Sequence, residues 1–491
     1  MNHTLAEVYN RVLKENVVPK IGTTADESLT IELIQKWQKT LNDYSIQHGD
    51  RLLILAEPSL DTIALFFAAW HKGAVVISLP PSTKEANLTL IAEDCHARYS
   101  INPHSNSWTA TNTVKKRDSI IKYRNCPTVT GIDLALIIYT SGSTGSPKGI
   151  MLTHTNVLSA LRSISQYLAL KAEDIILSVP PLHFDYGLYQ ILFSCFTQCS
   201  VYITPANTNP MQALKMVKEY QPTILPLVPA LAVGMVRLAK AMAFTFPSVR
   251  LITNTGGHLP VNIIHSLSVV FPNAQIMPMY GLTESKRVMF NTPEFVEKYP
   301  ESAGKPMPGI DAKVFAEHQT EQGVEYVETD IDEIGELWVR GASVMQGYTT
   351  DKNGAGCRLI AGNYRDDNWL ATGDLFSVNK EGFFFFRGRQ KELIKQAGFC
   401  LYPRDIEASI ESIGFIEDCA VIASEDESGD EIACLFVRSE KVVSKQELSK
   451  YLKSVLDTSY IPKRIEIIEQ WPLSVNGKID KKQLQRLLQK G

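Results

Sequence analysis

The chain has 491 residues, of which 44% are hydrophobic and 21% are charged. This length exceeds what one hydrophobic core supports, so we expect two or more domains. The composition is that of a globular protein and excludes a disordered or collagen-like chain. Lys and Arg number 49 against 53 Asp and Glu, which gives a net charge of −4. This balance gives no electrostatic basis for binding nucleic acid or an anionic membrane surface.

Eight cysteines are scattered along the chain without a CxxC pair. This spacing suits neither a disulfide framework nor a zinc site and favours a reducing compartment. The apolar surroundings of Cys195 and Cys199 predict buried packing. The N-terminus lacks the apolar core of a signal peptide, and the apolar run 63–70 is much shorter than a membrane span. We therefore expect a soluble, cytoplasmic protein with no membrane contact.

Helical and strand patterns alternate through the first 390 residues. Residues 29–49 and 61–73 carry helical patterns that end near Gly49 and Gly73, and each is followed by a short apolar strand pattern. The two strands are predicted at 51–57 and 75–81. Alternation of this kind predicts an α/β architecture in which helices cover the sheets.

Two later segments, 333–341 and 381–389, have the pattern of antiparallel strands joined by tight turns. The second contains four consecutive phenylalanines at 383–386. A run of this kind is typical of a buried strand and not of a stacking platform.

The charge pattern changes after Arg389. Residues 392–440 hold 3 basic and 12 acidic side chains, whereas residues 441–491 hold 11 basic and 5 acidic ones. Two strand patterns and one helical pattern follow, at 419–423, 433–438 and 445–456. We therefore predict an N-terminal domain, 1–390, and a small α+β C-terminal domain, 391–491.

The strongest chemical signal is a loop rich in glycine and hydroxyl groups. Seven of the nine residues from 141 to 149 are Ser, Thr or Gly, and Lys148 lies near its end. Glycines let backbone N–H groups approach an anion, hydroxyls donate hydrogen bonds and a lysine supplies charge, as a triphosphate requires. A flexible linker would not lie between an apolar strand and a helix, which we expect to begin near Thr153 or His154.

The spacing of this loop is not that of a Walker A motif. We nevertheless predict that it binds nucleotide phosphates, through Thr140, Ser141, Gly142, Ser143, Thr144, Gly145 and Lys148.

The loop, YTSGSTGSPKG, resembles the signature of the adenylate-forming superfamily, which includes acyl-CoA synthetases, adenylation domains of nonribosomal peptide synthetases and luciferases. Further motifs of that superfamily follow in order: TGG (255–257), YGLTE (280–284), ATGD (371–374), RGRQKELIKQAGF (387–399) and NGKID (476–480). The resemblance covers nearly the whole chain. It implies a large domain of mixed sheets layered with helices, a small barrel-like subdomain and a small, mobile C-terminal domain.

The resemblance also implies a two-step reaction. A carboxylate attacks the α-phosphate of ATP to give an acyl-adenylate and pyrophosphate, and a thiol then displaces AMP to give a thioester. Lys478 matches the catalytic lysine that bridges the carboxylate and the α-phosphate, and we count Lys148 with it, because the attack needs positive charge where the pentavalent phosphate forms. Thr283 and Glu284 match the residues that hold the α-phosphate and Mg²⁺, a hard cation that prefers oxygen ligands.

The remaining nucleotide contacts are also implied by the matching motifs. Tyr280 would stack on adenine, and Asp374 would accept hydrogen bonds from both ribose hydroxyls. Arg389 would reach the ribose or the phosphate. Three glycines would line the nucleotide closely, namely Gly256, Gly257 and Gly281. The family hinge falls at Lys391, about which the small domain would rotate between the two steps, withdrawing Lys478 and bringing in the loop from Lys395 to Phe399.

The segment 180–192 matches the motif at the acyl pocket of the superfamily. There Phe184 would border the nucleotide, and Asp185 would receive the α-ammonium of an amino acid. A buried carboxylate must be paired, so the alternative is that Asp185 pairs with a neighbouring side chain or caps a helix. Arg287 would disfavour an ammonium or bind a second carboxylate. The other wall candidates are His183, Tyr186, Tyr189 and Met279, and their bulk favours a small substrate.

No phosphopantetheine-carrying serine motif follows NGKID, so we expect the thiol acceptor to arrive in trans. An acidic carrier protein suits the basic C-terminal stretch, and the anionic phosphates of coenzyme A suit it equally. The main prediction is a ligase that loads an amino acid or another small carboxylate onto the phosphopantetheine of an acyl or peptidyl carrier protein. The alternative is an acyl-CoA synthetase, which Lys391 at the hinge favours. A non-catalytic nucleotide sensor is the third interpretation, and the presence of every catalytic position argues against it.

Overall fold

The structure is a computed structural model. It describes residues 4–8, 10, 20–24, 26–111, 128–141, 147–321, 323–350, 358–362, 367–396, 399–411, 413, 415–426, 430–439, 441–457, 460–473 and 479–488. Gly142, Ser143, Thr144, Gly145 and Lys478 were predicted as site residues and lie outside this described part.

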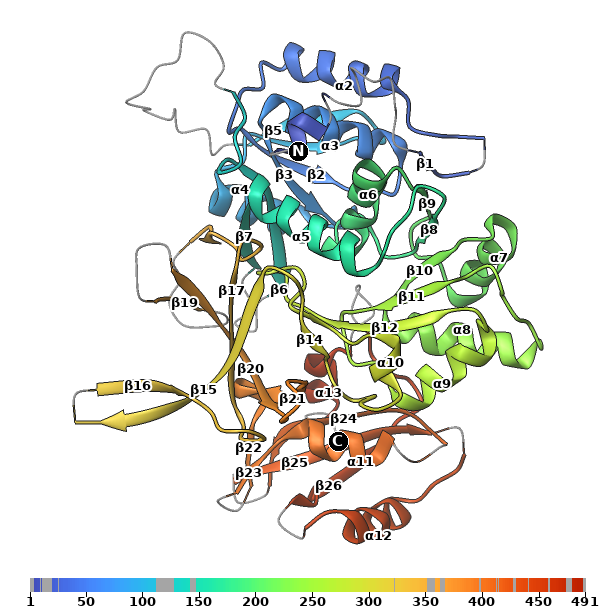
Figure 1. The fold of residues 1–491 in the computed structure, drawn as a ribbon, viewed down its shortest axis with the longest axis vertical. Helices are drawn as coiled ribbons and strands as arrows, with labels where there is room; N and C mark the ends of the chain where they lie inside the picture. The colour runs from blue at the N-terminus through green and yellow to red at the C-terminus, as the bar shows by residue number, and fades with distance from the viewer. Residues whose placement is uncertain are drawn as a thin grey trace.

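Two large sheets form the upper part of the molecule (Figure 1). The first has the strand order β18-β7-β6-β3-β2-β4-β5. Its strands are β2 (Arg51–Leu55), β3 (Val75–Leu79), β4 (Tyr99–Asn102), β5 (Ser107–Ala110), β6 (Leu134–Ser141), β7 (Pro147–Thr153) and β18 (Gly347–Tyr348). The helices that precede or connect them are α2 (Ile31–Asp43), α3 (Leu60–Lys72), α4 (Glu85–Cys95) and α5 (His154–Tyr167).

The second sheet has the order β1-β9-β8-β10-β11-β12-β13-β14. Its strands are β1 (Ile21–Gly22), β8 (Ile175–Ser178), β9 (Ser200–Ile203), β10 (Ile224–Leu227), β11 (Leu251–Asn254), β12 (Gln275–Tyr280), β13 (Met289–Phe290) and β14 (Lys305–Pro306). Its helices are α6 (Asp185–Thr197), α7 (Pro210–Tyr220), α8 (Pro229–Ala241), α9 (Val261–Val270) and α10 (Pro293–Val296).

Alternation of side chains along each strand produces a layered arrangement of helices and sheets. On β2, Leu52 packs into the central core with α3 and α5, whereas Leu53 packs with α4 on the opposite face. On β8, Ile176 belongs to the same central core, and Leu177 packs with α7 and α8. Helices α3, α5 and α6 therefore lie between the two sheets.

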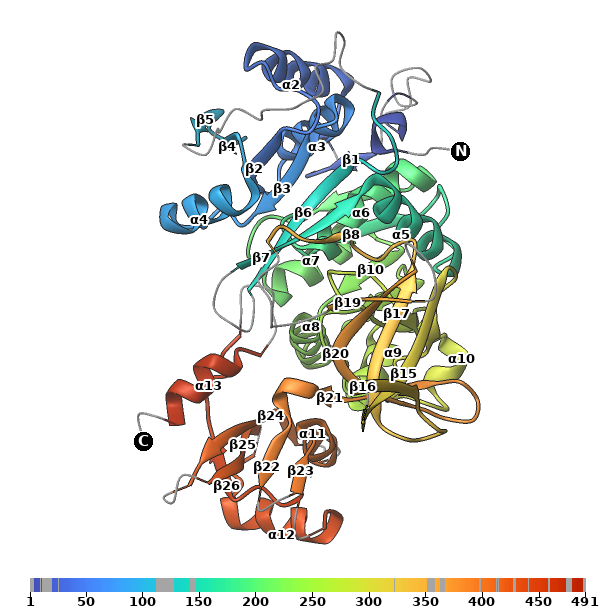
Figure 2. The same cartoon turned by 90° about the vertical axis from the view of Figure 1, so that its left-hand side faces the viewer.

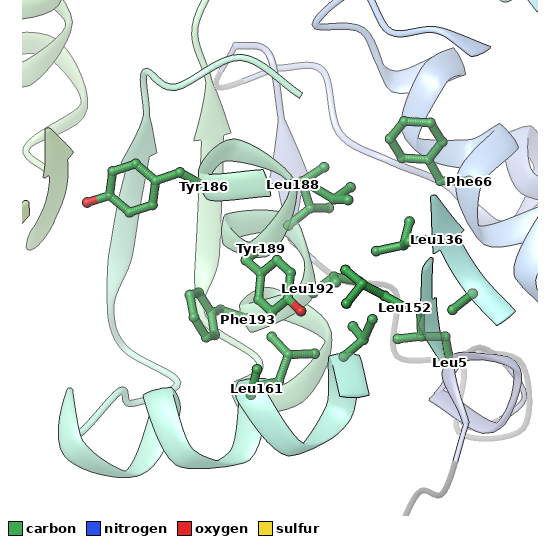
Figure 3. Close-up of a cluster of buried hydrophobic side chains, with 14 of the residues drawn as sticks. Leu5, Phe66, Leu136, Leu152, Leu161, Tyr186, Leu188, Tyr189, Leu192 and Phe193 are labelled. Carbon is green, nitrogen blue, oxygen red and sulfur yellow. The ribbon is translucent and has the colours of Figure 1, made fainter. Parts of the chain in front are cut away.

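Helix α6 contributes heavily to this central core. Figure 3 shows Leu136 and Phe66 on the side of α6 that carries Leu188, with Tyr186 directed to the other side. Cys195 on the same helix and Cys199 just after it are both buried, as predicted.

The predicted α/β architecture is confirmed, with shorter elements than the patterns suggested. The helix expected at 29–49 is α2, which ends at Asp43, and the helix expected at 61–73 is α3. Gly73 caps α3 with a φ of 74°, a left-handed conformation that glycine adopts without strain.

A third sheet has the order β16-β15-β17-β20-β19, with β21 paired to β20. Its strands are β15 (Ile310–Thr320), β16 (Gly323–Glu328), β17 (Gly335–Gly341), β19 (Arg358–Ala361), β20 (Asn368–Val378) and β21 (Phe384–Arg389). All pairings within it are antiparallel, as the sequence predicted for the segments that form β17 and β21. This sheet is the small barrel-like subdomain of the predicted fold. Of the four phenylalanines expected in a buried strand, Phe383 and Phe384 are buried, whereas Phe385 and Phe386 are half-buried.

The C-terminal part has its own sheet, β24-β25-β26, and a separate hairpin, β22-β23. Its elements are η1 (Gln390–Glu392), β22 (Ile394–Gln396), β23 (Phe399–Leu401), α11 (Pro403–Glu411), β24 (Ile416–Glu425), β25 (Glu431–Ser439), α12 (Lys445–Val455), β26 (Arg464–Ile467) and α13 (Lys481–Leu488). Helices α11 and α12 pack on one face of the sheet through Ile406 and Leu448, and α13 packs on the other through Leu484. Figure 2 shows α13 between this sheet and the larger part of the chain.

Candidate active site

The phosphate loop joins two antiparallel strands. Strands β6 and β7 pair in a register that sets Thr140 opposite Lys148. The prediction that the loop leads directly to a helix is wrong, because β7 intervenes and extends to Thr153. The predicted helix start is confirmed: α5 begins at His154, and Thr153 forms a capping box with Asn156.

Lys148 belongs to a row of polar groups at the base of this loop. Its Nζ lies 5.3 Å from the centre of the Tyr348 ring, within the range of a cation–π interaction. The Tyr348 hydroxyl donates to Glu284 Oε1 at 2.8 Å. Strand β18 carries Tyr348 and pairs with β7, which carries Lys148. The structure therefore places Lys148 and Glu284, predicted from separate motifs, on either side of one tyrosine.

The YGLTE motif forms a closed loop between β12 and β13. Met279 pairs with Phe290, and the N–H of Val288 donates to the Tyr280 carbonyl at 3.0 Å, which closes the loop. A Cβ on Gly281 would lie 2.2 Å from the Lys286 carbonyl oxygen, so only glycine fits there. Thr283 and Glu284 lie in this loop, and the Glu284 carbonyl accepts from the N–H of Met345 at 2.7 Å.

Asp374 is the centre of the predicted adenosine site. It is buried, and its Oδ2 accepts from the Tyr280 hydroxyl at 2.6 Å. Its Oδ1 lies 3.1 Å from Arg389 Nε, because β20 and β21 pair Asp374 directly with Arg389. Burial raises the pKa of the Asp374 carboxyl above its usual value, and the nearby Arg389 opposes that shift. Three residues predicted from three motifs thus meet at one carboxylate.

The TGG motif follows β11. Gly256 has a φ of 86°, a left-handed conformation that favours glycine. A Cβ on Gly257 would lie 3.2 Å from the Pro229 ring at the start of α8, so the backbone passes close to that helix. The structure brings this turn to the end of β11, next to the end of β12, where Tyr280 lies.

The acyl-pocket motif forms the start of α6. Asp185 is buried, and its Oδ2 lies 3.1 Å from Nζ of Lys286, which is also buried. The alternative that Asp185 pairs with a neighbouring side chain is therefore the one that the structure contains. Phe184 immediately precedes the helix, half-buried, and His183 is also half-buried.

Two tyrosines of α6 contact the basic side chains of Lys286 and Arg287. Lys286 Nζ lies 4.0 Å from the centre of the Tyr189 ring, and the Arg287 guanidinium lies 4.9 Å from that of Tyr186. The Tyr186 hydroxyl is fixed by Thr253, at 2.7 Å from Thr253 Oγ1. Met279 is buried and accepts from the Tyr167 hydroxyl at 3.1 Å. The predicted pocket residues Tyr186, Tyr189, Met279 and Arg287 line one cavity.

The hinge region joins the two parts through a short 3-10 helix, η1, in which Lys391 is exposed. Glu392 of this helix is 2.5 Å from Nζ of Lys481, at the start of α13. Leu473 and Ile479 form an isolated bridge, and Ile479 lies two residues before Lys481. The described residues that flank Lys478 therefore lie near Arg389 and the hinge, whereas Lys478 itself lies outside the described part. The domain boundary at 390 and the role of Lys391 stay predictions.

Magnesium fits this site through Glu284. Within the described ranges, no group of three or more His, Cys, Asp and Glu could hold a metal ion. Mg²⁺ in nucleotide sites usually takes one or two carboxylates, with water and phosphate oxygens completing its shell. Glu284 supplies one carboxylate, of which Tyr348 contacts Oε1.

Sequence reasoning missed two residues of this site. Lys286 adjoins the Arg287 that we singled out, but nothing in the pattern indicates that it turns toward Asp185. Its φ of 67° creates that turn. Tyr348 lies in no motif that we used, and its contact with Glu284 spans 64 residues of sequence. Neither Lys286 nor Tyr348 could have been identified as a site residue without knowledge of the strand pairing.

The family assignment follows from these sites together with sequence comparison. The family described as AMP-binding enzyme matches residues 39–349, and the family described as AMP-binding enzyme C-terminal domain matches residues 405–478. The chain belongs to the AMP-binding enzyme family, and it is an AMP-forming acid–thiol ligase that adenylates a carboxylate.

Curated relatives include CoA ligases and a bacitracin synthase. The chain is 25% identical to 4-coumarate–CoA ligase-like 6 of Arabidopsis thaliana, over 90% of this chain and 82% of that protein. It is 28% identical to a long-chain-fatty-acid–CoA ligase of Bacillus subtilis, over 72% of this chain and 61% of that protein. It is 26% identical to bacitracin synthase 1 of Bacillus licheniformis, over 90% of this chain but only 8% of that protein.

Solved structures share the fold along the whole chain. MatB from Rhodopseudomonas palustris with ATP bound has a TM-score of 0.82 and 22% identity, and the match covers 98% of each chain. o-Succinylbenzoate coenzyme A synthetase from Bacillus subtilis, in complex with ATP and a magnesium ion, has a TM-score of 0.79 and 21% identity, with 99% of each chain covered. Among the described residues, no helix combines the length and the apolar character needed to cross a membrane.

Proposed function

We propose that this chain is a carboxylate–CoA ligase, which activates a small carboxylate with ATP and transfers the acyl group to coenzyme A. One observation carries the choice of acid: the Asp185 carboxylate, which would bind the ammonium of an amino acid, is ion-paired with Lys286 at 3.1 Å. An ammonium would have to displace a buried partner, which is costly. Similarity to coumarate and fatty-acid CoA ligases supports the choice of acceptor.

The adenylation step depends on positive charge around the α-phosphate. We propose that Lys148 and the glycine-rich loop bind the β- and γ-phosphates and that Lys478 bridges the substrate carboxylate and the α-phosphate. Thr283 contributes a hydroxyl donor, and Glu284 would hold Mg²⁺. Bound magnesium would neutralise phosphate charge, so that an anionic carboxylate can approach. The chain's own contribution is to fix these groups before the reaction, which lowers the reorganisation cost.

The nucleoside is held on the opposite side of the YGLTE loop. Asp374 is buried and acceptor-only, and its contacts with Tyr280 and Arg389 fix its orientation. The two ribose hydroxyls would donate to it. Tyr280, whose hydroxyl is held by Asp374, keeps its ring in a defined plane for adenine to stack on.

The thioester step would use a second orientation of the C-terminal part. We propose that rotation about Lys391 withdraws Lys478 and brings the β22–β23 hairpin toward the acyl-adenylate. The exposed position of Lys391 in a three-residue helix suits a hinge, because few contacts must break there.

A carrier protein is the second candidate for the acceptor. Similarity to bacitracin synthase 1 over 90% of this chain supports it, as does the excess of basic residues in 441–491.

The test is ATP–pyrophosphate exchange with a panel of amino acids, aryl acids and short carboxylic acids, followed by thioester formation with coenzyme A or a phosphopantetheinylated carrier protein. We expect exchange with acids that lack an amino group and thioester formation with coenzyme A. Exchange with an amino acid alone, or transfer to the carrier protein alone, would overturn the proposal.

A further inference from the structure

The loop that closes the YGLTE motif carries two buried cations at its end. Lys286 and Arg287 are 3% and 4% exposed, respectively. They follow Glu284 by two and three residues, and the loop closes at Val288. The same short loop therefore holds the groups assigned to the α-phosphate and two positive charges directed into the acyl pocket.

The two basic side chains of this pocket differ in their partners. Asp185 pairs with Lys286 at 3.1 Å and has no ion pair with Arg287. In the described part of the chain, no carboxylate forms an ion pair with Arg287. Its Nη1 donates to the Lys286 carbonyl at 2.9 Å, and its Nε has no hydrogen-bond partner. A guanidinium stays charged in proteins, and an unpaired charge is costly to bury.

The space beside this guanidinium is small. The cavity has a volume of about 10 Å³ and is lined by Arg287, Lys286, Tyr186, Met279 and the apolar Ile164 and Leu168. That volume admits about one water-sized group. An oxygen-bearing group fits against the guanidinium, but a long acyl chain does not fit beyond it.

We infer that Arg287 is a specificity-determining residue that binds a second carboxylate of the substrate, so that the enzyme prefers short dicarboxylic acids. One carboxylate would react near Glu284, and one oxygen of the other would accept a hydrogen bond from the unpartnered Nε of the guanidinium. Lys286 already pairs with Asp185, so it needs no carboxylate from the substrate. The inference rests on the proposed function.

The first experiment measures ATP–pyrophosphate exchange by the purified full-length chain. The acids are malonate, succinate and glutarate, compared with propionate, butyrate, benzoate and alanine. A site built around a buried charge rejects ligands that leave the charge unpaired, so we expect kcat/KM for the best diacid to exceed that for its monoacid analogue at least about 100-fold.

Each outcome separates the two proposals. Exchange with monocarboxylates at comparable or higher efficiency overturns this inference and leaves the carboxylate ligase in place. Exchange with alanine alone overturns both. Silence with every acid also overturns both.

The second experiment compares Arg287→Met with Arg287→Lys. We expect Arg287→Met to lose at least about 100-fold in kcat/KM for the diacid while monoacid exchange holds or rises, and Arg287→Lys to keep part of the diacid activity. The control is Lys39→Met, at an exposed position on α2, which should match the parent with every acid. A melting temperature for each variant accompanies the kinetics. Equal losses with diacids and monoacids, or a lowered melting temperature with equal losses, would indicate a structural role and overturn the inference.

Discussion

The proposed nucleotide side and the proposed acyl side of this site differ in how their buried charges are paired. On the nucleotide side, one buried carboxylate, Asp374, is balanced by Arg389, whose side chain is 55% exposed. On the acyl side, one buried carboxylate, Asp185, lies beside two buried cations. The first arrangement is satisfied without a ligand and offers acceptors to hydroxyl donors. In the second, the Arg287 guanidinium has no carboxylate partner among the described residues, and an anionic ligand would supply one.

The difference matters because the two sides share one short loop. Tyr280 at the start of the loop contacts Asp374, and Lys286 near its end contacts Asp185. The backbone approach at Gly281 holds the two ends together. Four experiments test the roles proposed for the two sides.

The largest expected effect is that of Lys478→Ala, which removes the charge proposed to act between the two sides. We expect adenylation to fall about 100- to 1,000-fold, as for other groups that stabilise transition-state charge, while ATP still binds. ATP–pyrophosphate exchange measures adenylation, and calorimetric titration measures ATP binding. Lys450→Ala, at an exposed lysine on α12, is the control. Unchanged adenylation in Lys478→Ala would remove the role assigned to that residue.

The second experiment tests the protonation state of Lys286 on the acyl side through stability. Burial lowers the pKa of Lys286 from 10.5 to about 7, and Asp185 opposes that shift. Between these values the unfolded chain binds more protons than the folded one, so stability rises with pH. A single group of this kind adds about 2 kcal/mol to the free energy of unfolding between pH 7 and pH 9.

This contribution should disappear in Lys286→Met. The difference in unfolding free energy between parent and variant, from urea titrations at both pH values, isolates it. Lys215→Met, at an exposed position on α7, should leave the pH dependence unchanged. If the unfolding free energies of parent and variant change by the same amount between the two pH values, Lys286 is charged in the folded protein at both.

The third experiment tests the balanced side. Asp374→Asn keeps the shape but removes the charge that faces Arg389, and it replaces one acceptor oxygen by a donor. Hydrogen bonds to charged groups contribute about 1.5–3 kcal/mol, so we expect KM for ATP to rise about tenfold or more. Asp311→Asn, on β15 of the third sheet, is the matched control. An unchanged KM for ATP would dissociate Asp374 from the ribose.

The smallest expected effect is that of Tyr348→Phe, which deletes one hydrogen bond to Glu284. We expect the Mg²⁺ concentration for half-maximal exchange to change about threefold, because a neutral donor to a carboxylate has a modest net effect. Tyr326→Phe, on β16, serves for comparison. A larger shift for Tyr326→Phe than for Tyr348→Phe would contradict the placement of Glu284 at the metal.

Much of this molecule is specified by local sequence. The apolar periodicities locate α2, α3, β2 and β3, because burial on one or both faces imposes the period of each element. The ordered motifs identify the superfamily and the residues that meet at Asp374. The capping residue Thr153 marks the start of α5, since its side chain satisfies a free backbone N–H.

Tertiary structure decided what these residues contact. The sequence permitted Asp185 to bind an ammonium or a neighbouring side chain, and only the left-handed turn at Lys286 selects the second. The strand β7 after the phosphate loop and the contact between Tyr348 and Glu284 depend on pairing between distant segments. Long-range pairings of this kind are set by the packing of whole layers, whereas periodicity and motif spacing record only local geometry and chemistry.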